Sequence, residues 1–191
     1  MKLRFLYTAL SLLLLTSACL YGQSPGNFSI EKGFDKYPLG SKEPEADSLL
    51  AKPVGSDFQW KGIKYVTYFY KNANEHPYKL ADVDFKILIL NYGDSTLGNI
   101  EFTKIYSSRL YPDYENRAKD EFKKLYAFYK EKWKGGGKKE TAVKVGDKIV
   151  RFKHYEWNSG NRVMKLWLDW TKRPGNSYYS ISLSLEAKAD L

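Results

Sequence analysis

Two histidines, His76 and His154, are the only ones in this 191-residue chain that could serve as a general base near neutral pH. His76 stands in the polar stretch Asn74-Glu75-His76-Pro77, which is typical of a solvated turn. His154 lies in a segment with strand character, Ile149 to Trp157, where a structural or surface role is more common. Neither is accompanied by a Gly-x-Ser-x-Gly nucleophile elbow. The residue types therefore do not predict a hydrolytic triad.

The carboxylates and glycines give no stronger signal for catalysis. Asp82 and Asp84 share one face of a predicted strand, but no histidine or third carboxylate lies near to complete a metal site. Glu156 and Asp169 could face each other across a hairpin as a glycosidase pair, yet nothing in their spacing selects them. The run 135–137 is three glycines without the Lys-Ser/Thr of a phosphate loop. We expect no enzymatic activity, no metal and no cofactor.

Two surface features favour binding instead. The basic segment from Lys130 to Lys139 includes an aromatic residue at a predicted helix end and could meet anionic head groups or an acidic protein. The alternative is a solvated helix end whose lysines complement the helix dipole. The candidate binding residues of this segment are Trp133, Lys138 and Lys139.

The second feature is the aromatic content, 16% of the chain, which gathers in predicted strands. Exposed rings stack on sugars or anchor protein interfaces, whereas cross-strand pairs merely stabilise a sheet. Trp167 alternates with Val163 and Lys165, so we expect it on the outer face of its strand. Trp157 and Trp167 are the candidate anchors.

Hydrophobic periodicity predicts two helices in the region 40–191, which we take as one domain. The first begins at Ser41 and should stop before Pro53. The second, from Asp113 to Trp133, is stronger because apolar residues recur every three or four positions. Its expected stripe is Tyr114, Ala118, Phe122, Leu125, Tyr129 and Trp133.

Alternating apolar residues predict about six strands. One strand should place Val83, Phe85, Ile87 and Ile89 on the same face. In the last strand, the residues expected to point inward are Tyr179, Ile181, Leu183 and Leu185, with the serines between them pointing out. The predicted fold class is α+β: an antiparallel sheet of about six strands with two helices packed on one face.

A short sequence pattern that occurs twice is compatible with two tandem helix-plus-three-strand units. Phe58-Gln59-Trp60-Lys61-Gly62 and the segment from Tyr155 to Gly160 both place a tryptophan before a turn glycine. With Leu39-Gly40-Ser41-Lys42-Glu43 opening the first helix, the chain resembles a group of exported bacterial proteins. The group includes the β-lactamase inhibitor protein and the small lipoprotein of the outer-membrane barrel-assembly machine. The resemblance implies protein binding, although this fold lacks the cysteines that form the inhibitor's disulfides.

Residues 1–22 have the layout of an export signal, with a basic start, an apolar run and small residues before the only cysteine, Cys19. Thr16-Ser17-Ala18-Cys19 resembles a lipoprotein box, except that Thr16 replaces the usual leucine. Cleavage before Cys19 would leave a lipid-anchored cysteine, whereas cleavage near Gly22 would remove it. Residues 23–39 read as a polar tether.

The formal net charge is +9, and removal of two basic residues with the signal leaves +7. Export argues against nucleic acid as the partner of this charge. We therefore expect a non-enzymatic binding or assembly protein of the bacterial cell envelope, in the periplasm or at the cell surface. Its expected partner is a protein, and the alternative is a glycan-binding module that uses exposed sheet aromatics.

Overall fold

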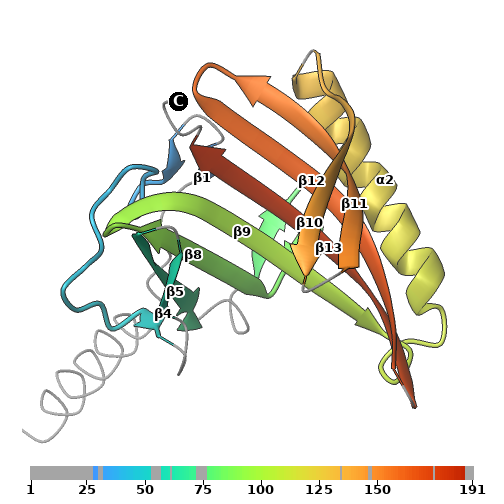
Figure 1. Cartoon of the computed structure of the whole chain (residues 1–191). Helices are drawn as coiled ribbons and strands as arrows, with labels where there is room; N and C mark the ends of the chain where they lie inside the picture. The colour runs from blue at the N-terminus through green and yellow to red at the C-terminus, as the bar shows by residue number, and fades with distance from the viewer. Residues whose placement is uncertain are drawn as a thin grey trace, which may run out of the picture.

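The fold is built on one large antiparallel sheet (Figure 1). The computed structural model describes residues 28–29, 32–52, 57–60, 62–71, 77–133, 135–145, 148–173 and 175–187. Within these residues nine strands form the sheet, with β3 (Leu50–Ala51) and β4 (Asp57–Trp60) both paired with β5. The order from the other edge is β10 (Gly137–Val145), β11 (Lys148–Ser159), β12 (Arg162–Arg173), β13 (Asn176–Ala187), β9 (Thr96–Ser107), β8 (Ile87–Gly93) and β5 (Ile63–Tyr70). Two small sheets consist of β1 (Phe28–Ser29) with β2 (Gly33–Phe34), and of β6 (Tyr78–Leu80) with β7 (Val83–Phe85).

Side chains alternate between the two faces of the large sheet, and strand pairing continues each face across its neighbours. In β13, Ile181, Leu183 and Leu185 are buried on one face, as their alternation predicts. Ser182 and Ser184 lie on the other face. We call the first the helix face, because the only helix among the described residues packs on it, and the second the far face.

The helix α2 (Tyr114–Lys132) covers part of the helix face, and its predicted apolar stripe is confirmed. Ala118, Leu125 and Tyr129 are buried, and a buried side chain of the size of Leu125 contributes about 2 kcal/mol. Glu121 on the same helix accepts hydrogen bonds from Lys104 and Tyr106 of β9. The helix is therefore held on the sheet by both apolar and polar contacts.

Aromatic residues from the N-terminal region cover the rest of the helix face. The ring of Phe34 is fully buried and lies 4.7 Å from the ring of Tyr78 and 5.7 Å from that of Phe102 on β9. The described part of the expected tether is thus packed on the sheet. Its buried apolar side chains are those of Phe34, Tyr37 and Leu39.

The predicted fold class is wrong. The described chain is mostly β, and it has nine strands in its main sheet and one helix instead of six strands and two helices. No helix follows Ser41, because the backbone there bonds to the β8–β9 hairpin: Glu43 N–H donates to Ser95 O, and Leu97 N–H donates to Ser41 O. Pro44 also lacks an N–H group to donate. Without this helix, the two tandem helix-plus-three-strand units are wrong as well.

The apolar run from Val83 to Leu90 forms two strands rather than one. Lys86 separates β7 from β8, and each belongs to a different sheet. Val83 and Phe85 are buried as expected, but in β8 the buried residues are Leu88, Leu90 and Tyr92 rather than Ile87 and Ile89. An Ile-Leu-Ile-Leu run is apolar on both faces, so alternation could not decide which face turns inward.

Candidate functional site

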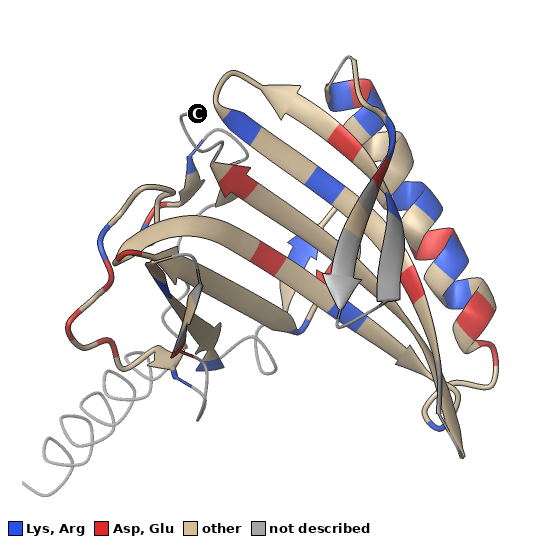
Figure 2. Ribbon diagram, in the orientation of Figure 1, with Lys and Arg blue, Asp and Glu red and all other residues tan. Residues whose placement is uncertain are grey.

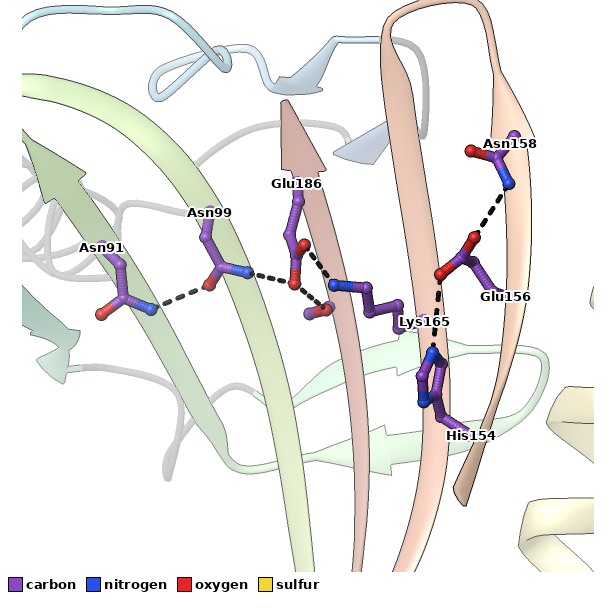
Figure 3. Close-up of polar contacts among 8 residues, drawn as sticks. Asn91, Asn99, His154, Glu156, Asn158, Lys165 and Glu186 are labelled. Carbon is purple, nitrogen blue, oxygen red and sulfur yellow. Dashed lines mark hydrogen bonds and ion pairs between the residues drawn. The ribbon is translucent and has the colours of Figure 1, made fainter. Parts of the chain in front are cut away.

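A row of polar side chains crosses five strands on the far face (Figure 3). Thr67 of β5 donates to Asn91 Oδ1 of β8 at 2.8 Å, and Asn91 Nδ2 donates to Asn99 Oδ1 of β9 at 2.8 Å. Asn99 Nδ2 donates to Glu186 of β13 at 3.5 Å, and Lys165 Nζ of β12 donates to the same carboxylate at 2.6 Å. The strand register sets this order. The first four residues, from Thr67 to Glu186, are directly opposed on successive strands. Lys165 is opposed to Ser184, two residues before Glu186.

Glu186 is the junction of the row. Besides Asn99 and Lys165, it accepts a hydrogen bond from Ser184 at 3.1 Å. The side chains of Lys165 and Glu186 are 27% and 30% exposed, so solvent screens their ion pair and it contributes at most about 1 kcal/mol. The pair positions the carboxylate more than it stabilises the fold.

Glu156 of β11 forms a second carboxylate centre beside the row. It accepts hydrogen bonds from Asn158 at 3.1 Å and meets His154 Nε2 at 3.5 Å. Burial alone would raise the pKa of Glu156, but the contacts with Asn158 and His154 and the positive charge of Lys165 together lower it. Lys165 therefore stands between the carboxylates of Glu156 and Glu186.

In the part of the chain that the structure describes, no serine lies beside His154 as a nucleophile. Its ring is buried and its polar contact is with Glu156. Ser182 lies on the same face, but Trp167 of the intervening strand is paired with it, which puts two strand spacings, about 9–10 Å, between the serine and the histidine. Among the residues that the structure describes, no group of three or more His, Cys, Asp or Glu side chains could hold a metal ion.

A pocket of about 500 Å³ opens at the Asn91 end of the row. Its lining includes the side chains of Tyr65, Asn91, Asn99 and Glu186, with Gly93 and Gly98 between them. This volume lies within the range of small-ligand pockets, roughly 300–1,000 Å³.

Two glycines shape the pocket. A Cβ atom on Gly93 would lie 3.5 Å from Tyr65 Cε1, so the tyrosine ring rests against this glycine. Gly98 is the extra residue of a β-bulge, because Asn91 pairs with Asn99 whereas the next residue, Tyr92, pairs with Leu97. The bulge places Asn99 opposite Asn91 on the far face, and a Cβ on Gly98 would meet only open space.

Two of the predicted binding residues, the anchor Trp157 and Trp133 of the basic segment, lie in the core instead. Trp157 is 1% exposed and packs under α2 against Tyr126 and Tyr129, with ring centroids 6.1 and 6.2 Å away. A Cβ on Gly136 would lie 2.0 Å from the Trp157 indole, so the glycine run lets the ring fit beneath the chain. Trp133 is also buried, at 9% exposure. Both rings are therefore buried, whereas the sequence pattern predicts exposed side chains.

The other predicted residues remain at the surface. Trp167 lies on the far face, as expected, where it is half-buried and bonds to Asp169. Burial raises the pKa of Asp169 despite this hydrogen bond, which lowers it. Lys138 and Lys139 are exposed on β10, and Lys139 is paired with His154. Cys19 and the export signal lie outside the described residues.

Sequence reasoning missed Asn91, Asn99 and Glu186. Asn91 interrupts an apolar strand, which is a usable signal, but the turn residues Gly93-Asp94 and Gly98-Asn99 favour one long turn over 92–99. The actual turn is only Asp94-Ser95, where positive φ values of 46° and 62° reverse the chain within two residues. The pairing of Asn91 with Asn99 follows from this tight turn and the bulge, neither of which the sequence pattern indicates.

Comparisons with protein-family models, curated proteins and solved structures find no match to this chain. Its function is therefore argued from the site itself. Among the described residues, the one helix is not long and apolar enough to span a membrane.

Proposed function

We propose that this chain is a non-enzymatic binding protein exported to the bacterial cell envelope, and that its partner docks at the far-face pocket. The observation that carries the proposal is the polar row next to a hollow of about 500 Å³. Its polar side chains, from Thr67 to Lys165, are held by one another across five strands. Side chains fixed in this way lose little entropy when a ligand binds.

The charge distribution supports the choice of face. Figure 2 shows Lys and Arg alternating with Asp and Glu along α2, whereas the strands carry isolated charges. On the helix the two signs pair locally, as in Glu115 with Lys119 and Asp120 with Lys123. Such exposed pairs are typical of a solvated helix surface and offer little specificity.

Export follows from residues 1–22, and the location we propose is the periplasm or the cell surface. Cys19 is either lipidated, which would anchor the chain to a membrane, or removed with the signal. Mass measurement of the mature N-terminus distinguishes these outcomes, because lipidation adds the mass of the acyl chains to Cys19.

Site-specific photo-crosslinking in the intact envelope tests the binding face. A photoreactive amino acid replaces Thr96, which lines the pocket and is exposed, or Lys123, which is exposed on α2. We expect a crosslinked partner from position 96 and not from position 123. Equal products from both positions, or none from position 96 at native expression, would contradict the proposal.

A further inference from the structure

The two asparagines of the pocket retain hydrogen-bonding capacity. In the row, Asn91 and Asn99 each donate once and accept once. A side-chain amide has two N–H donors and two oxygen lone pairs. Within the described residues, each asparagine therefore keeps one donor and one acceptor, which match a hydroxyl group because a hydroxyl both donates and accepts.

An aromatic residue also lines the pocket beside these amides. The ring of Tyr65 lines it and lies against Gly93. The bulge residue Gly98 leaves the space above its backbone open. An aromatic ring next to planar polar groups suits a ligand with one apolar face and hydroxyl groups at its edge.

The charges in and beside the pocket lining restrict the net charge of the ligand. Among the residues that the structure describes, Glu186 is the only charged one that lines the pocket, and Lys165 pairs with it at 2.6 Å from outside that lining. An anionic ligand would find no cation in the lining, and a cationic ligand would have to compete with Lys165. The pocket therefore favours a neutral ligand.

We propose that this pocket binds a pyranose unit of a neutral oligosaccharide, with Asn91 and Asn99 bonded to its hydroxyl groups and Tyr65 against its ring. The inference rests on the proposed binding function and names the ligand class of the same site. A free oligosaccharide and a cell-wall polymer present the same chemistry.

Calorimetry with the intact exported protein tests the inference. The probes are the tetrasaccharides of cellulose, chitin, starch and mannan, together with a tetragalacturonate as an acidic control. At least one neutral probe should bind, and the acidic one should not. Co-sedimentation with insoluble cellulose, chitin, starch and mannan then separates a polymer receptor from one for free sugars.

Asn99→Ala and Tyr65→Ala should each weaken binding about tenfold or more, since each removes a direct contact. Asn158→Ala, on the same face but outside the pocket, is the matched control and should bind as the parent does. Circular dichroism and melting curves show whether each variant is folded. If a folded Tyr65→Phe variant keeps binding while Tyr65→Ala loses it, the ring rather than the hydroxyl makes the contact.

Absence of binding to every neutral probe at millimolar concentration, or binding unchanged in folded Asn99→Ala and Tyr65→Ala, would overturn the inference. The proposed function would survive that result if position 96 still crosslinked a protein. If neither a glycan nor a crosslinked partner were found, both proposals would fail.

Discussion

The two faces of the sheet use the same residue types for opposite purposes, as Trp157 and Trp167 show. Trp157 fills the helix face under α2, where a Gly136 backbone covers it. Trp167 lies half-buried on the far face among serine, lysine and aspartate side chains. The helix face thus stabilises the fold through buried apolar side chains, whereas the far face carries polar side chains that hold one another in position.

The largest difference in stability between the two faces should appear when each of the two tryptophans is replaced by alanine. Trp157→Ala leaves a cavity in a packed core and should lower the free energy of unfolding by about 3–5 kcal/mol. Trp167→Ala removes a half-buried ring and should cost about half as much or less. Urea denaturation measures both, and equal losses would break the comparison.

Substitution of Gly136 tests more specifically whether Trp157 packs beneath this turn on the helix face. In Gly136→Ala the new Cβ collides with the Trp157 indole, so we expect a loss of about 1–3 kcal/mol. Gly137→Ala is the matched control, because a Cβ there meets nothing within 4 Å. If the two variants melt at the same temperature, Trp157 does not pack beneath this turn.

Low pH should remove more stabilising free energy from the contacts of Asp47, on the helix-face side, than from those of Glu156 on the far face. Asp47 accepts hydrogen bonds from Tyr37 at 2.8 Å and from Leu49 N–H at 2.9 Å, and it pairs with Lys36. Burial alone would raise the pKa of Asp47, but these contacts lower it overall. Because the pKa is lower in the folded than in the unfolded state, where it is about 3.9, ionised Asp47 stabilises the fold above that pH.

That contribution is lost as the pH falls through the lower, folded pKa. We expect Asp47→Asn to cost about 1–2 kcal/mol at pH 7 and progressively less below pH 4. Glu156→Gln on the far face should cost less, since its carboxylate is more exposed. Melting temperatures recorded from pH 7 to pH 2 measure both, and a pH-independent cost for Asp47→Asn would refute the role of its charge.

The sequence predicts those parts of the fold in which alternation or periodicity is unambiguous. The α2 stripe and the inward residues of β13 are of this kind, because only one face of each is apolar. The segment after Ser41 had helix-capping residues, but long-range backbone bonds to the β8–β9 hairpin replaced the helix. Local propensity cannot anticipate such contacts.

The candidate site was less predictable than the fold. Trp167 was placed on the correct face, yet Trp157 was chosen for its residue type, and its burial depends on α2 and Gly136 packing over it. The pocket needs Asn91, Asn99 and Glu186 from three strands, joined by a bulge and by register. Those features arise only when the strands pair.

The smallest expected effect on stability is also the most informative. Asn99→Ala removes one amide from a half-exposed row, so the free energy of unfolding should change by less than about 1 kcal/mol.

The most direct test of the account measures crosslink yield from position 96 in an Asn99→Ala background, together with the urea denaturation curve of the same protein. If the far face binds while the helix face stabilises, the yield falls several-fold and the curve barely moves. An unchanged yield, or a loss of stability above about 3 kcal/mol, would contradict the account.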